Sequence, residues 1–283
     1  MTSSGAAFAE REYNLRAAFP DHPQWFARWA ADSERARLSM RVVRDVRYGA
    51  GTKQTVDLFP AERPRGALLF IHGGYWRALD KEDHSFIAPP FVAEGIGVAV
   101  VNYDLCPGVR ITDIAEQCRQ AVEWLTREGA IHGVPAPRLV IGGHSAGGHL
   151  TAMMFATDWM ARGTSADPII GGVSISGVFD LEPLVDVSFN SDLGLDLRSA
   201  REVSPIHLDP RVHAPLLLAA GEDETEEFIR QSRSLWERWP RCRPRAHDGP
   251  LFVPGKHHFS VLTEFADPQS ALFATTMDMF EGD

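Results

Sequence analysis

A series of continuous apolar runs, separated by segments with helical spacing, constrains the fold of this chain more than any other feature. Runs of this kind are typical of strands buried on both faces of a parallel sheet. They occupy residues 66–74, 97–104, 138–144, 169–176 and 214–221. Between them, apolar residues recur three or four positions apart, as in 111–125, which indicates helices. Strands that alternate with helices predict right-handed βαβ crossovers and a mostly parallel sheet covered on both faces.

The flanking segments extend this pattern. Residues 41–48 and 54–59 are predicted strands, joined into a hairpin by a turn that contains glycine. The first forty residues are predicted to form one or two amphipathic helices. A final strand before Gly255 and a C-terminal helix that ends near Phe280 complete the expected α/β architecture.

Composition and charge exclude several kinds of partner. The chain has 283 residues, of which 44% are hydrophobic, so it can build a sizeable core without metals or disulfides. Its formal net charge of −10 repels phosphates and anionic lipid headgroups, so we expect neither a nucleic acid nor a membrane as partner. No apolar run reaches the ~18 residues that a membrane span needs. The N-terminus lacks a signal-peptide pattern, and the three cysteines are scattered, which predicts a cytoplasmic location.

The pentapeptide Gly143-His144-Ser145-Ala146-Gly147 is the sharpest chemical signal in the chain. It has the G-x-S-x-G pattern, directly follows an apolar run and directly precedes a predicted helix. A strand that turns sharply into a helix holds the serine at a strained apex, with its oxygen above the sheet. We interpret Ser145 as a nucleophile, His144 as a packing residue and Ala146 as a backbone donor to an oxyanion. The alternative is a glycine-rich turn with a surface serine.

A second motif, His72-Gly73-Gly74-Tyr75-Trp76, follows an earlier buried run. A glycine loop at this position of an esterase-like hydrolase donates backbone N–H groups to the oxyanion. Two successive glycines let the chain turn its amides inward. Gly73 and Gly74 are therefore candidate oxyanion-hole residues, with a plain β-turn as the alternative. Tyr75 and Trp76 are candidate walls of a substrate pocket, with packing against the sheet as the alternative.

Further segments carry a family resemblance: YGAGTKQTVDLF (48–59), VNYDLCP (101–107) and GEDETEEFIRQSR (221–233). Together with the two motifs above, they resemble the kynurenine formamidase (arylformamidase) branch of the α/β-hydrolase superfamily, over nearly the whole chain. The resemblance implies an α/β-hydrolase fold with a serine, a histidine and an acidic residue as a catalytic triad. Relatives that act on other small amides and esters share most of these motifs. The resemblance therefore predicts the fold and the chemistry of this chain more specifically than its substrate.

Two adjacent histidines are candidates for the base. In this fold the triad follows the chain order Ser, Asp or Glu, then His. His257 and His258 lie in a short loop after the last predicted strand, where the base is expected. The resemblance aligns a D-H-F pattern with His257-His258-Phe259, which implies that His258 is the base. Two alternatives stay open: His257 is the base in place of His258, or both are solvated loop histidines without a catalytic role.

The acid is expected in the loop that follows the run 214–221. Aspartate is commoner at this position of the fold, which favours Asp223. The resemblance instead places the acid at the fourth position when Gly221 is counted as the first, which is Glu224, and we favour Glu224 with Asp223 as the alternative. A lesser candidate, Asp180, is better interpreted as a helix N-cap.

The sequence thus predicts an N-terminal helical extension over residues 1–40, packed on an α/β-hydrolase catalytic domain over residues 41–283. The expected function is a serine hydrolase that cleaves a small amide, such as the aryl formamide N-formylkynurenine, through an acyl-enzyme. A broad-range carboxylesterase is the alternative, and a non-catalytic binding protein on the same fold is a third hypothesis. The histidines form no H-E-x-x-H set and the cysteines no C-x-x-C set, so neither a metal nor another cofactor is expected. The sequence is compatible with a homo-oligomer.

Overall fold

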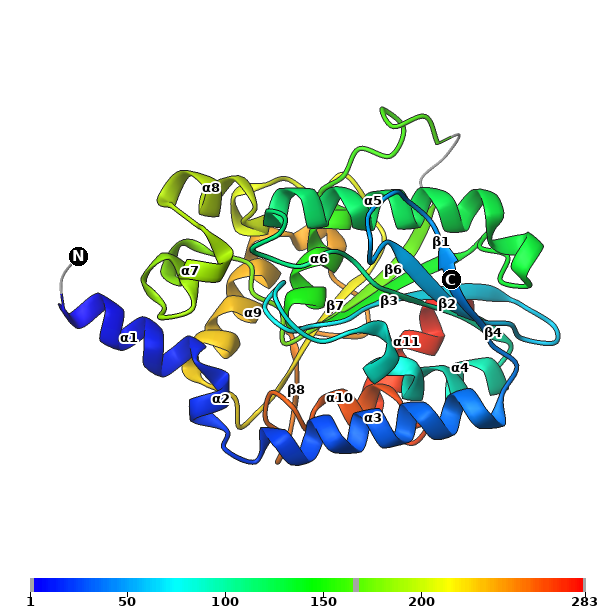
Figure 1. The fold of residues 1–283 in the computed structure, drawn as a ribbon, viewed down its shortest axis with the longest axis horizontal. Helices are drawn as coiled ribbons and strands as arrows, with labels where there is room; N and C mark the ends of the chain where they lie inside the picture. Colours follow the sequence, from blue (N-terminus) through cyan, green and yellow to red (C-terminus); the bar gives the residue numbers. More distant parts are fainter. Residues whose placement is uncertain (1–2, 165–167, 282–283) are drawn as a thin grey trace.

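A computed structural model describes residues 3–164 and 168–281 of the chain. Within these residues, one eight-stranded sheet has the order β1-β2-β4-β3-β5-β6-β7-β8 (Figure 1). β1 pairs antiparallel with β2, and β2 pairs antiparallel with β4, whereas the remaining pairs are parallel. The strands are β1 (Val43–Arg47), β2 (Thr55–Phe59), β3 (Gly66–Ile71), β4 (Ile96–Val101), β5 (Leu139–His144), β6 (Ile169–Ile175), β7 (Leu216–Gly221) and β8 (Leu251–Val253).

The predicted strands are all present, and burial explains their continuous apolar sequences. Every residue of β3, β4, β5 and β7 is buried, because helices cover both faces of the sheet. In Figure 1, α5 (Ile111–Glu128) and α6 (Ala146–Phe155) lie on one face, and α4 (Ala88–Ala93) and α11 (Ala271–Glu281) lie on the other. The predicted hairpin and the mostly parallel sheet are therefore confirmed.

The N-terminal segment forms three helices rather than the one or two that the sequence predicts: α1 (Ser3–Tyr13), α2 (Leu15–Ala18) and α3 (His22–Ser39). Asn14 separates the first two, and its side chain accepts a hydrogen bond from the Ala17 N–H as an N-cap. Pro20 lies between α2 and α3, where a proline disfavours a continuous helix. The last of these helices packs against the 3₁₀ helix η1 (Lys81–Ile87), and the first packs against α9 (Glu226–Arg238).

The connection from β6 to β7 also differs from the prediction of one helix after each strand. It contains η3 (Glu182–Asp186), α7 (Asn190–Leu193), α8 (Leu197–Glu202) and η4 (Pro205–His207) instead. Gly194, with φ of 65°, ends α7 in the left-handed conformation that glycine adopts readily. A capping box between Asp196 and Ser199 then starts α8. Short helices with local caps therefore replace the single expected helix.

Three short elements remain. They are η2 (Gly129–His132), η5 (Pro240–Cys242) and α10 (Leu262–Phe265). Within the two described ranges, none of the helices combines the length and hydropathy needed to span a bilayer.

Among the described residues, five histidines are buried, and four of them lie outside the pair of neighbouring histidines in the last loop: His72, His84, His144 and His149. Burial lowers the pKa of each of these four. The pKa of His84 falls to about 3 and that of His149 to about 4. These imidazoles are therefore neutral in the folded protein at neutral pH.

We expect the free energy of unfolding to decrease as the pH falls from 6.5, the ordinary pKa of histidine, toward the lowered values near 4 and 3. In this pH window the histidines of the unfolded chain bind protons, whereas the same histidines stay neutral when they are buried in the folded protein. The free energy of unfolding therefore rises with pH and falls on acidification. At pH 5, His84 and His149 each contribute on the order of 1–2 kcal/mol to this loss. His84→Phe should reduce the difference between pH 7 and pH 5 by about one such contribution, measured by urea unfolding.

The exposed His213 provides a control, since His213→Gln removes a solvated histidine. The assignment would be wrong if His84→Phe and the wild-type protein lost the same stability between the two pH values.

Candidate active site

Ser145 lies at the junction between β5, which ends at His144, and α6, which begins at Ala146. Its φ of 57° and ψ of −118° are strained values for a residue with a side chain. Two glycines allow the turn: a Cβ on Gly143 would lie 2.2 Å from the Gly147 oxygen, and a Cβ on Gly147 would lie 1.9 Å from the Ile71 oxygen. The chain therefore forms the strand-turn-helix that the motif predicts, with Ser145 at its apex.

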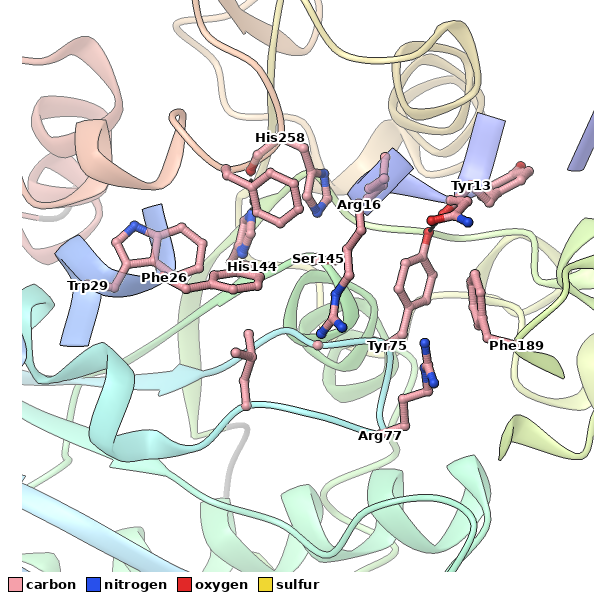
Figure 2. A pocket seen from close by; sticks show the side chains of 15 residues that line it. Tyr13, Arg16, Phe26, Trp29, Tyr75, Arg77, His144, Ser145, Phe189 and His258 are labelled. Carbon is pink, nitrogen blue, oxygen red and sulfur yellow. Dashed lines mark hydrogen bonds between the residues drawn. The ribbon is translucent and has the colours of Figure 1, made fainter. Parts of the chain in front are cut away.

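His258 lies in the loop between β8 and α10 and is 1% exposed. Its Nδ1 is 2.8 Å from Glu224 Oε2, so Nδ1–H donates to the carboxylate and Nε2 is left to face a substrate. The sharp turn at residues 143–147, here called the elbow, itself supports this loop, because His144 Nε2 donates to the His258 carbonyl oxygen at 2.8 Å. His144 thus packs beneath the loop, and Ser145 and His258 line one pocket (Figure 2).

The structure separates the alternatives for acid and base by burial. Glu224 is buried against His258, whereas the Asp223 side chain is exposed and its backbone N–H donates to the Lys256 oxygen. His257 turns the other way, with Nε2 3.1 Å from Asp21 Oδ2, and its ring stacks on Phe19. Of the candidates, Glu224 and His258 are the pair that the fold brings into contact.

The second oxygen of the Glu224 carboxylate, Oε1, accepts hydrogen bonds from the Ser176 hydroxyl and, at 2.9 Å, from the Gly221 N–H. The prediction from the sequence missed Ser176. It directly follows β6, whose neighbours β5 and β7 carry the elbow and the acid, and its φ is 52°. Its place at the carboxyl end of an apolar run was the available signal. The hydrogen bonds to Oε1 fix the carboxylate and compensate part of the cost of burying its charge.

The glycine loop after β3 lies directly against the elbow. A Cβ on Gly73 would come within 2.8 Å of the His144 oxygen and 3.0 Å of the Ser145 Cβ. Gly74 has φ of 102°, a conformation that favours glycine. Among the described residues, the N–H groups of Gly73, Gly74 and Ala146 donate no hydrogen bond, so they are free to bind an anion.

His72 supports this loop by contacts with its backbone and with Tyr103. Its Nδ1 lies 2.8 Å from the Gly73 carbonyl oxygen, and its ring stacks on Tyr103 with centroids 4.3 Å apart. The Tyr103 hydroxyl donates to the His72 carbonyl oxygen at 2.8 Å. The loop carbonyls are thereby held in the interior.

Aromatic rings form much of the pocket wall (Figure 2): Phe26, Trp29, Tyr75, Phe189 and Phe259. Tyr75 thus lies where the sequence analysis expects a pocket wall. Trp76 does not line the pocket. It is fully buried, and its indole Nε1–H donates to His149 Nδ1 at 3.2 Å, which satisfies the indole away from the pocket.

The N-terminal helices contribute one side of the pocket, with Tyr13, Asn14, Leu15 and Arg16 alongside the two aromatic residues from α3. The Tyr75 hydroxyl donates to the Tyr13 carbonyl oxygen at 2.7 Å. The Tyr13 hydroxyl in turn donates to Glu227 Oε2 at 2.6 Å, and burial raises its pKa, so it stays protonated. These contacts fix the N-terminal segment to both the glycine loop and α9.

Among the described residues, one group has the spacing of a metal site: Asp180, Glu182 and His207, whose ligand atoms lie within 4.8 Å of one another. None of them lines the pocket. Glu182 Oε1 is paired with Arg201 at 2.7 Å, and Asp180 Oδ1 accepts from the Glu182 N–H at 3.1 Å. Asp180 is not the predicted N-cap, because the N-cap position of η3 is occupied by Leu181. The group is therefore accounted for by contacts within the chain.

Comparisons with known proteins identify relatives over most of the chain. A family model described as BD-FAE matches residues 59–193, which include the glycine loop and the elbow. Kynurenine formamidase of Salmo salar is 29% identical over 269 residues, which cover 86% of this chain and 88% of that protein. Kynurenine formamidase of Drosophila melanogaster is 31% identical, over 78% of this chain and 76% of its own. A crystal structure from Silicibacter sp. TM1040, provisionally named a thioesterase, is 34% identical with a TM-score of 0.84, and the match covers 94% of this chain and 97% of that one.

The mostly parallel sheet, with an elbow at the end of β5, defines an α/β-hydrolase. Its relatives are hydrolases, and the protein is a hydrolase as well. Within that class, the chain belongs to the kynurenine formamidase family.

The Glu224–His258 contact predicts that substitutions of Glu224 and of its neighbour Asp223 have different effects on kcat. Glu224→Gln should lower kcat on a short p-nitrophenyl ester by about 10⁴-fold, because an amide holds the wrong imidazole tautomer and cannot stabilise the imidazolium. Asp223→Asn should change kcat little, since its side chain is exposed and away from His258.

Circular dichroism shows whether each variant is folded. A folded Glu224→Gln protein with wild-type kcat would contradict the assignment, as would an equal loss of activity in Asp223→Asn.

Proposed function

We propose that the protein is a serine hydrolase that cleaves a small aryl formamide, such as N-formylkynurenine, through an acyl-enzyme. The observation that carries the proposal is the buried Glu224–His258 contact, with Nδ1 2.8 Å from Oε2, beside the elbow serine in one pocket. A base that is oriented in this way is what a serine hydroxyl needs to become a nucleophile. Membership of the kynurenine formamidase family supports a formamide as the substrate.

In the proposed reaction, Ser145 Oγ attacks the formyl carbon while His258 Nε2 takes the hydroxyl proton. The N–H groups of Gly73, Gly74 and Ala146 bind the oxyanion, and each such donor is worth about 10²–10³ in rate. The C–N bond then breaks, and the amine leaves with the proton from His258. Water attacks the formyl-enzyme by the same route and releases formate and the free serine.

The pocket walls favour an aryl leaving group. Phe26, Tyr75, Phe189 and Phe259 present rings against which a planar aromatic group can stack. A formyl group is the smallest acyl group, so the remainder of the substrate would occupy the aromatic space.

An ester substrate is the second candidate, because the same machinery cleaves esters and the Silicibacter relative carries a thioesterase name. The two candidate functions predict opposite orders of kcat/KM for formamide and ester substrates. A formamidase should show a higher kcat/KM on N-formylkynurenine than on p-nitrophenyl acetate or butyrate, and the reverse order would favour the esterase.

Ser145→Ala tests the chemistry for either substrate. Removal of the nucleophile should lower kcat on the order of 10⁶-fold, as in other serine hydrolases, while the thermal unfolding temperature stays near that of the wild type. Release of formate, measured together with loss of the formamide absorbance, gives the rate. A folded Ser145→Ala protein with substantial turnover would refute the acyl-enzyme mechanism.

A further inference from the structure

The charge of the pocket is opposite in sign to that of the chain as a whole. The chain has 38 acidic and 28 basic residues, yet the residues that line the pocket include Arg16 and Arg77 and, within the described part of the chain, no aspartate or glutamate. The Glu224 carboxylate is next to the pocket but lies behind His258, its hydrogen-bond partner. The charged side chains that reach the pocket are therefore cationic.

The two arginines differ in their partners. Arg77 forms an ion pair with Asp192, and its guanidinium carbon lies 4.9 Å from the centroid of the Phe189 ring. Arg16 has no carboxylate within ion-pair distance among residues 3–164 and 168–281. Its guanidinium carbon is 5.8 Å from the centroid of the Phe26 ring, a cation–π contact that leaves the N–H groups available.

Arg16 points toward the reacting groups. Figure 2 shows its side chain extending from α2 into the pocket that Ser145, Tyr75 and His258 line. The backbone of this helix is anchored, because Leu15 is buried and the preceding Tyr13 carbonyl oxygen accepts from the Tyr75 hydroxyl. An unpaired guanidinium carried by an anchored helix beside the pocket is suited to bidentate binding of a carboxylate.

We propose that Arg16 is a specificity-determining residue that binds a carboxylate on the leaving-group side of the substrate. The inference rests on the proposed function, which places the scissile carbonyl at Ser145. The formyl group is too small to reach α2, so the anion must belong to the aryl amine part. The substrate class is then an aryl formamide with a carboxylate on a side chain of the ring, and the N-terminal helices supply its selectivity.

The test compares two substrates that differ only in the charge of one group: N-formylkynurenine and its C-terminal carboxamide. The wild-type protein should have the higher kcat/KM on the carboxylate. In Arg16→Gln, the ratio of the two kcat/KM values should fall about 10- to 100-fold, mostly through KM, as expected for the loss of a charge-assisted hydrogen bond. Arg16→Lys should retain part of the ratio, because it keeps the charge and loses the bidentate geometry.

Arg28 provides a matched control. It is an exposed arginine on α3 whose guanidinium carbon lies 5.7 Å from the centroid of the Trp25 ring, and it does not line the pocket. Arg28→Gln should leave the substrate ratio unchanged. A ratio in Arg16→Gln equal to that of the wild type would overturn the inference and leave the formamidase proposal intact.

A separate result would identify failure of the proposed function itself. If the wild type cleaves neither formamide, the acetate ester of 3-(2-hydroxyphenyl)propanoate and the carboxamide of that ester form the substrate pair. The same fall in the ratio for Arg16→Gln would then support carboxylate binding by an esterase, and an unchanged ratio would refute it.

Discussion

The contact between the buried Glu224 carboxylate and the His258 imidazole depends on the register of β7 and β8. These strands pair in parallel, with Gly221 opposite Val253, so the two loops leave the same edge of the sheet together. Gly221 permits the close passage, since a Cβ there would lie 2.1 Å from the Lys256 oxygen. A buried carboxylate is stable only where its oxygens are satisfied, and hydrogen bonds from Ser176, Gly221 and His258 satisfy them here. The end of β6 and the ends of β7 and β8 therefore all contribute to one buried hydrogen-bonded pair.

Much of the fold could be predicted from the sequence, because strands buried on both faces carry continuous apolar residues and the elbow motif requires a strand-turn-helix. The site was harder to predict in detail. Periodicity does not extend into a loop, so it could not distinguish Glu224 from Asp223; the structure distinguishes them by burial and by contact with His258. The prediction that Trp76 lines the pocket was wrong for a similar reason. Adjacent side chains in a tight turn point in different directions, and the Trp76 indole N–H donates to the buried His149 instead. Ser176 was missed because its role depends on strand order, which composition does not reveal.

The N-terminal segment and the sheet-bearing segment share one site. The Tyr13 hydroxyl donates a hydrogen bond to Glu227 on α9, and the Tyr75 hydroxyl donates one to the Tyr13 carbonyl oxygen. Asp21 Oδ2 lies 3.1 Å from Nε2 of His257, the neighbour of the proposed base. These contacts explain why residues early in the chain form pocket walls beside a nucleophile more than a hundred residues later. We propose that the segment acts as part of the catalytic unit, with selectivity residing in its helices and chemistry in the ends of the strands.

The central claim is that Ser145 is an activated nucleophile, and covalent labelling with a fluorophosphonate tests it most directly. The reagent requires a serine whose proton is removed by a neighbouring base, which few surface serines have. Mass spectrometry of the digested, labelled protein should locate one adduct, on the peptide that contains Ser145, and His258→Ala should abolish rapid labelling. An adduct on a different serine, or a folded wild-type protein that the reagent does not label, would contradict the account.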